Sequence, residues 1–148
     1  MSELPPGRWL GLDYGSRRIG VAVCDPTGTV ATPLATVENR GIEAVLTDLR
    51  RIASEVRAVG LIIGLPVRTG GEEGPEARAA REFGARVETT LGIPVRLWDE
   101  RLTTAGAERA LIEGGVRRER RRAIIDRVAA QMILQSYLDS RTPPPDPF

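Results

Sequence analysis

The order of apolar patterns along the chain constrains its fold more than any other feature of the sequence. Three short apolar runs come first, joined by stretches too short for a helix, so we expect three antiparallel strands. Two later apolar runs each follow a segment with helical spacing and are expected to join the sheet in parallel, through right-handed crossovers. The expected strands are 9–14, 17–24, 30–37, 61–64 and 94–98, and the expected helices are 42–52, 76–91, 103–115 and 123–139. The predicted fold class is α/β, a five-stranded mixed sheet with three antiparallel strands followed by two parallel ones and helices on both faces.

Length and composition indicate how the chain is organised. Its 148 residues suit one compact domain, which we expect over residues 1–142, followed by a flexible proline-rich tail at 143–148. No apolar run approaches the length that a membrane span needs, and the N-terminus lacks the pattern of a signal peptide. We therefore expect a soluble cytoplasmic protein that does not contact a membrane.

Missing residue types narrow the possible chemistry. The chain contains no histidine, all 21 of its basic residues are arginine, and Cys24 is its single cysteine. These absences exclude Ser-His-Asp and Cys-His sites, lysine Schiff bases, the lysine of a phosphate-binding loop, Cys/His zinc sites and internal disulfides. An enzyme of this composition depends on carboxylates, and carboxylate clusters prefer hard cations such as Mg²⁺ or Mn²⁺.

Three carboxylates stand at unusual positions: Asp13 where the first strand ends, Glu100 just after the fifth strand, and Asp126 in line with the apolar stripe of the last helix. Because sites form at the carboxyl ends of parallel strands, Asp13 and Glu100 are expected at the same edge of the sheet. Three converging acids can hold two divalent ions about 4 Å apart. Each acid also has an ordinary role open to it: Asp13 can pair with Arg18, Glu100 can be a loop acid, and Asp126 can be a first-turn acid.

The first hairpin offers a way to bring two of these acids together. If a two-residue turn joins the first two strands, Gly11 lies opposite Gly20. In the same register Asp13 lies opposite Arg18. One face of the hairpin then carries small residues and Asp13, which allows a helix to approach closely. The last helix has small residues of its own beside Asp126, so docking of the two small faces would bring Asp126 near Asp13.

A run of arginines precedes Asp126. Residues 117–122 carry five arginines and one glutamate, a local charge of +4 on a chain whose net charge is only +1. We interpret the run as a flexible loop that binds phosphates beside the acids, although a solvated helix end is the ordinary alternative. The expected nucleic-acid-binding residues are Arg17, Arg18, Arg117, Arg118, Arg120, Arg121 and Arg122.

Four motifs follow one another in order along the chain. They are Leu12-Asp13-Tyr14-Gly15 with Ile19-Gly20-Val21-Ala22, Gly64-Leu65-Pro66, Asp99-Glu100-Arg101-Leu102-Thr103-Thr104, and Asp126-Arg127-Val128-Ala129-Ala130. Together they resemble the YqgF/RuvX family of bacterial RNase H-like nucleases, over nearly all of residues 8–139. The resemblance implies an RNase H-like fold and an endonuclease that hydrolyses phosphodiester bonds with Mg²⁺ or Mn²⁺ as cofactor.

The resemblance also implies roles for single residues. The acids of the family map onto Asp13, Glu100 and Asp126, which would be catalytic residues and metal ligands. Better-known resolvases of the superfamily carry a fourth acid where this chain has Ala129, and Asp99 would then support the ligands from outside. The family is described both as Holliday junction resolvases and as nucleases that process the 16S rRNA precursor. The expected partner is therefore branched DNA or precursor rRNA.

The sequence is also compatible with two other classes of function. A protein that binds nucleic acid without cutting it would bind equally well without Mg²⁺ and without the acids. A phosphotransferase of the actin and sugar-kinase type also places an Asp-x-Gly turn after its first strand, but it needs a second, similar domain that 148 residues do not accommodate. A resolvase is expected to be a homodimer, because it cuts two strands symmetrically.

Overall fold

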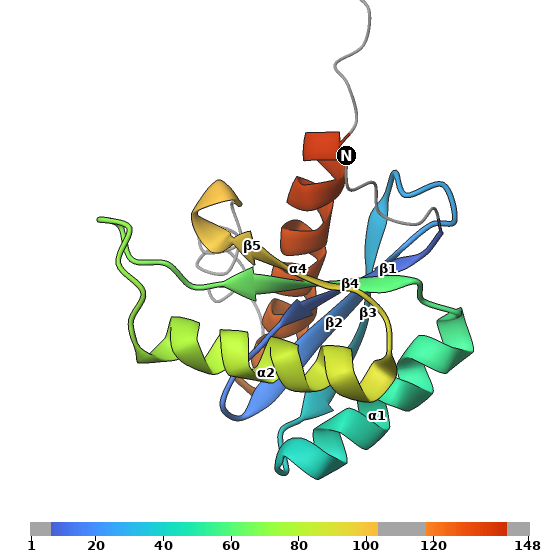
Figure 1. Cartoon of the computed structure of the whole chain (residues 1–148), viewed down its shortest axis with the longest axis horizontal. Helices are drawn as coiled ribbons and strands as arrows, with labels where there is room; N and C mark the ends of the chain where they lie inside the picture. Colours follow the sequence, from blue (N-terminus) through green and yellow to red (C-terminus); the bar gives the residue numbers. More distant parts are fainter. Residues whose placement is uncertain (1–6, 104–117, 142–148) are drawn as a thin grey trace, which may run out of the picture.

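A five-stranded mixed sheet forms the centre of the computed structural model, which describes residues 7–103 and 118–141 (Figure 1). The strand order is β3-β2-β1-β4-β5. The β1–β2 and β2–β3 pairs are antiparallel, while the β1–β4 and β4–β5 pairs are parallel, so the predicted fold class is confirmed. The elements are β1 (Trp9–Asp13), β2 (Arg18–Cys24), β3 (Ala31–Glu38), α1 (Ile42–Val56), β4 (Gly60–Leu65), α2 (Pro75–Leu91), β5 (Val95–Asp99), the 3₁₀ turn η1 (Glu100–Leu102) and α4 (Arg118–Arg141).

Helices cover both faces of the sheet. α1 and α2 lie on one face and α4 lies on the other (Figure 1). All six residues of β4 are buried, as is typical of a parallel strand that is covered on both sides. On the α1 and α2 face, Leu49 and Phe83 are among the helical side chains that pack against Leu12 and Ile63 of the strands. Within the described residues, no helix is long and apolar enough to cross a membrane.

Small residues line the face of the sheet that α4 covers. A Cβ atom built on Gly11 would lie 2.6 Å from Cβ of Leu134 and 2.9 Å from the carbonyl oxygen of Ala130. A Cβ atom built on Gly20 would overlap the carbonyl oxygen of Asp126. The backbone of α4 therefore lies directly on β1 and β2, and the predicted docking of the last helix on the small-residue face of the hairpin is confirmed.

Polar side chains fasten α4 to the edge strand β3. The backbone N–H of Ala31 donates to Oε1 of Gln135 over 2.8 Å, and Nε2 of Gln131 donates to the carbonyl oxygen of Ala31 over 3.0 Å. Nearer the start of the helix, Oγ1 of Thr36 donates to the carbonyl oxygen of Ala123 over 2.9 Å. These bonds fix the part of α4 that carries Asp126 over the hairpin.

The predicted register of the first hairpin is wrong by two residues. Gly11 pairs with Ala22 instead of Gly20. Asp13 pairs with Gly20 instead of Arg18. Because a shift of two residues keeps every side chain on its own face of the sheet, Asp13 still faces α4.

The connection between β1 and β2 explains the shift, since it holds four residues (14–17) instead of two. Tyr14 leaves the strand to stack on Phe83 of α2, with 4.3 Å between the ring centroids. Nδ2 of Asn39 donates to the carbonyl oxygen of Gly15 over 3.0 Å. These contacts come from segments far along the chain, and they replace the tight turn that the local sequence suggests.

The last helix begins earlier than predicted, at Arg118 instead of residue 123, and ends at Arg141. Residues 118–122 are therefore helical, and the interpretation of this run as a flexible loop is wrong. Arginine and glutamate are good helix formers, so the run extends the helix toward its N-terminus. The expected helix at 103–115 falls almost wholly on residues outside the described ranges, and the expected tail at 143–148 lies outside them as well.

Candidate active site

Asp13 ends β1 and is half-buried. Both strands beside it carry a glycine at this level. Asp13 pairs with Gly20 of β2, and on β4 Gly64 directly follows Ile63, the partner of Leu12. Because side chains alternate along each strand, Asp13, Gly20 and Gly64 share the face that α4 covers. The two glycines leave room for groups from other elements on either side of the Asp13 carboxylate.

Asp126 of α4 lies over the first of these glycines. Its carbonyl oxygen takes the space where a side chain on Gly20 would begin. Its carboxylate oxygen Oδ2 accepts a hydrogen bond from Nε of Arg18 over 2.7 Å, and the two side chains are 16% and 29% exposed, respectively. The structure thus brings Asp126 to the strand next to Asp13 and pairs its carboxylate with an arginine of the hairpin.

Glu100 lies over the second glycine. β5 ends at Asp99, and Glu100 opens the turn η1 that follows. A Cβ atom built on Gly64 would lie 2.6 Å from Oε1 of Glu100 and 2.6 Å from Cδ1 of Ile133. A glycine at position 64 therefore lets the Glu100 carboxylate lie against β4, the strand beside the one that ends in Asp13.

Asp99 holds the turn that carries Glu100. Its Oδ1 accepts the backbone N–H of Arg101 over 2.9 Å, and its Oδ2 accepts Nη2 of Arg101 over 2.7 Å. The Arg101 guanidinium holds the pKa of the Asp99 carboxyl below its ordinary value. Nη1 of Arg101 also reaches the carbonyl oxygen of Thr69 over 3.5 Å, which joins the loop after β4 to the turn. Asp99 thus caps the turn that Glu100 opens.

Ser136 ties the same turn to α4. Nε1 of Trp98 donates to Oγ of Ser136 over 3.0 Å, and Oγ of Ser136 donates to the carbonyl oxygen of Leu102 over 2.9 Å. The Trp98 ring packs edge-on against Tyr137, with 5.4 Å between centroids. One hydroxyl therefore connects the helix that carries Asp126 to the turn that carries Glu100.

Replacing Ser136 by alanine should loosen this connection. The substitution removes both hydrogen bonds and leaves the Trp98 N–H without its acceptor, so we expect the free energy of unfolding to fall by about 1–2 kcal/mol. Urea denaturation measures the change. Ser140→Ala is the matched control, because Oγ of Ser140 donates within its own helix, to the carbonyl oxygen of Tyr137. Equal losses in both variants would contradict a linking role for Ser136.

The donor chemistry of the three acids suits a hard divalent cation, since carboxylate oxygens are the ligands that Mg²⁺ and Mn²⁺ prefer. The three acids come from separate segments of the chain. Gly64 leaves room for the Glu100 side chain against β4, and Gly20 leaves room for the backbone of Asp126 against β2. In the part of the chain whose side chains are described, however, no three acids, histidines or cysteines stand close enough to hold a metal ion together. The Asp126 carboxylate is turned instead to Arg18.

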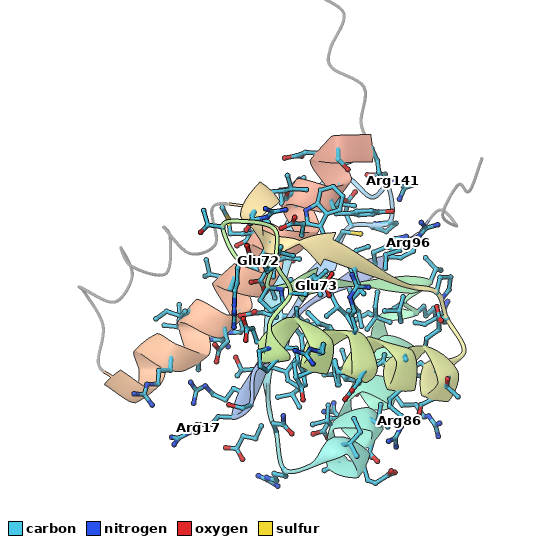
Figure 2. The ribbon with its side chains drawn as sticks, turned by 60° about the vertical axis from the view of Figure 1, so that its left-hand side comes forward. Arg17, Glu72, Glu73, Arg86, Arg96 and Arg141 are labelled. Carbon is cyan, nitrogen blue, oxygen red and sulfur yellow. The ribbon has the colours of Figure 1, made fainter. Side chains whose placement is uncertain are left out.

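The described arginines among those predicted to bind nucleic acid lie at or just before the start of β2 and in the first turns of α4. Arg17 is exposed on the β1–β2 connection and points outward (Figure 2). Arg18 follows it and is bonded to Asp126. Arg118, Arg120, Arg121 and Arg122 belong to the first turns of α4, directly before the turn that carries Asp126. Arg117 lies outside the described residues.

Sequence reasoning did not find the roles of Ser136 and of the Arg18–Asp126 pair. A signal for Ser136 exists, because it continues the stripe that runs from Asp126 through Ala129 and Ile133 on the helix. The pairing of Arg18 with Asp126 depends on the hairpin register and on how the helix docks. Neither of these can be derived from local sequence.

Comparison with known proteins identifies the family of this chain. The sequence model of the RuvX family, described as Holliday junction resolvase, matches residues 7–140. A protein of Myxococcus xanthus named "Putative pre-16S rRNA nuclease" is 47% identical over 137 residues, which cover 93% of this chain and 91% of that protein. A protein of Clostridium botulinum with the same name is 44% identical over 132 residues, covering 89% and 96%.

Solved structures give the fold independently. The structure of T. thermophilus RuvC in complex with a Holliday junction substrate superposes with a TM-score of 0.60, covering 92% of this chain and 97% of that chain. The sequence identity is 13%, so this likeness speaks for the fold alone. The RNase H-like fold that the motifs imply is confirmed. With a family model matched over almost the whole chain and relatives above 40% identity, the chain belongs to the RuvX (YqgF) family.

Proposed function

We propose that this protein is a metal-dependent endonuclease that hydrolyses phosphodiester bonds in structured nucleic acid. The observation that supports it most is the position of Asp13 between Gly20 and Gly64, the two places where the sheet admits Asp126 and Glu100. The segments that carry these three acids lie around the carboxyl end of β1, the place where open α/β sheets form their sites.

In the proposed site Asp13, Glu100 and Asp126 would hold the metal, with Asp13 as the central ligand. Mg²⁺ or Mn²⁺ bound there would supply an activated water and stabilise the charge on the leaving oxygen. The chain has no histidine or lysine to act as a base, so the carboxylates would orient the water. Arginines stay protonated at every working pH and hold phosphate oxygens, a task that we assign to Arg17 and the arginines of residues 118–122.

Two substrates follow from the relatives. The relatives are named as nucleases of precursor 16S rRNA, and the family model is described as Holliday junction resolvase. Both are branched or folded nucleic acids of the cytoplasm, where we propose that this protein acts. If it resolves junctions, it must cut two strands symmetrically and is expected to act as a homodimer.

The decisive experiment offers labelled four-way DNA junctions and labelled precursor 16S rRNA to the purified protein, each with Mg²⁺, Mn²⁺ or a chelator. We expect cleavage of at least one substrate with a divalent ion and none with the chelator. The faster substrate identifies the reaction. If the protein binds a substrate tightly but cleaves neither substrate with Mg²⁺, with Mn²⁺ or with the chelator, the proposal is contradicted and the protein is a nucleic-acid-binding protein. Hydrolysis of ATP without nuclease activity would instead favour a phosphotransferase.

A further inference from the structure

The bond between Arg18 and Asp126 places a positive charge of the protein itself on an acid of the site. Nε of Arg18 lies 2.7 Å from Oδ2 of Asp126, and the side chains are only 29% and 16% exposed, so solvent screens the pair weakly. The backbones of the two residues are held close together, because the backbone of α4 at Asp126 rests on Gly20, two residues along β2 from Arg18. The Arg18 side chain is therefore always within reach of the Asp126 carboxylate.

The surroundings of the pair explain why a cation belongs there. Asp13 lies beside Gly20 on the neighbouring strand, and Glu100 lies over Gly64 on the strand beyond it. Like charges gathered at one place repel one another, and a cation among them lowers this repulsion. Glu38, the residue opposite Arg18 on β3, accepts hydrogen bonds from Arg40 instead. Arg18 is thus the cation bonded to the acid that α4 brings to this end of the sheet.

We propose that Arg18 is the resident counter-ion of the acid site, bonded to Asp126 until a divalent cation binds and then released to a phosphate of the nucleic acid. This inference rests on the proposed metal site. It accounts for the lack of a three-acid cluster among the described side chains, because one of the three acids is occupied by an arginine. A guanidinium suits both partners, since its planar fork matches carboxylate and phosphate oxygens alike.

Competition between Arg18 and a metal ion has a measurable consequence. A variant without the guanidinium leaves the Asp126 carboxylate open to the metal, so Arg18→Gln should bind Mn²⁺ more tightly than the original protein. Loss of one competing charge-assisted hydrogen bond corresponds to roughly a tenfold gain in affinity. The same variant should melt at a lower temperature in chelator, because a half-buried carboxylate then has lost its counter-ion.

The test is a calorimetric titration of Mn²⁺ into the full chain, without nucleic acid, for the original protein, Arg18→Gln and Arg17→Gln. The matched control removes the same charge from the neighbouring residue, which is exposed and points outward (Figure 2). Its Mn²⁺ affinity should stay within about twofold of the original. Arg18→Lys keeps the charge without the fork and should give an intermediate affinity, which serves as the test if Arg18→Gln does not fold.

The outcomes separate this inference from the proposed function. Unchanged or weaker Mn²⁺ binding in Arg18→Gln, or in Arg18→Lys if only that variant folds, would overturn the role of Arg18 whether or not the protein cleaves nucleic acid. Tighter binding in a protein that cleaves neither junctions nor precursor rRNA would support the counter-ion and contradict the nuclease. An equal gain in Arg17→Gln would show a general effect of net charge, which also overturns the proposal.

Discussion

Asp13→Asn is expected to abolish cleavage of nucleic acid while leaving its binding largely intact. Asparagine keeps the shape of the side chain between Gly20 and Gly64 but removes the negative charge that a divalent cation needs. We expect the rate of cleavage to fall by more than about 100-fold, since loss of even an outer partner of a metal ligand costs 10- to 100-fold. Gel assays of labelled substrate with Mn²⁺ measure cleavage, and filter binding in chelator measures affinity.

The matched control for this substitution is Asp139→Asn. Asp139 lies exposed on α4, where its Oδ1 accepts a hydrogen bond from Nε2 of Gln135 over 2.9 Å, away from the turn that carries Asp126. The same change of charge there should leave the cleavage rate within about twofold of the original, as expected for a surface site. Full activity in Asp13→Asn would end the proposal. Loss of nucleic-acid binding in Asp13→Asn would show that Asp13 contributes to substrate binding instead of to the cleavage step.

The sequence suffices to predict that Asp13 and Glu100 lie at the same edge of the sheet, because each stands where an apolar strand ends and both strands run in the same direction. That argument needs only strand order and the rule for parallel strands, and the structure has both strands as predicted. How closely the acids approach one another depends on Gly20 and Gly64, whose spacing to α4 and η1 is set by packing across the sheet. The distance between the acids cannot be derived from the local sequence.

The partner of Arg18 could not be derived from the sequence for a related reason. A two-residue turn would place Arg18 opposite Asp13, and an ion pair across the hairpin then looks reasonable. The stacking of Tyr14 on Phe83 lengthens the connection instead, and Arg18 moves beyond the end of β1, where it meets Asp126. A contact between residues 69 positions apart thus decides which acid receives the guanidinium.

The arginine run lies in a helix, although its charge pattern alone does not distinguish a helix from a loop. The local charge of +4 is a property of composition, and it predicts an affinity for phosphate equally well in a loop or a helix. A glycine pair directly before the run, at positions 114 and 115, favours a loop, whereas the helix propensity of arginine and glutamate favours the helix that residues 118–122 form. The backbone of residues 118–122 therefore continues the same helix that carries Asp126.

Gly20→Ala is expected to cause the largest loss of stability among single methyl additions in the sheet. The added Cβ atom would overlap the carbonyl oxygen of Asp126 and lie 3.1 Å from the backbone N of Arg127. Backbone atoms cannot rotate out of the way as a side chain can, so α4 must move off β2. We expect the free energy of unfolding to fall by about 3 kcal/mol or more, at the upper end of overpacking effects. Urea denaturation measures it.

Gly84→Ala is the matched control and is expected to raise the free energy of unfolding. The contrast shows that the loss in Gly20→Ala comes from the overlap with α4 and not from adding a methyl group as such. A Cβ atom built on Gly84, inside α2, would lie 3.5 Å from Cδ1 of Ile63 and 3.6 Å from Cγ1 of Val95, which is ordinary packing distance. Alanine in a helix interior is favoured over glycine by roughly 0.5–1 kcal/mol, so this variant should gain stability. If Gly20→Ala were as stable as Gly84→Ala, α4 would not rest on β2 at Gly20. The placement of Asp126 beside Asp13, on which the proposed site depends, would then lose its physical basis.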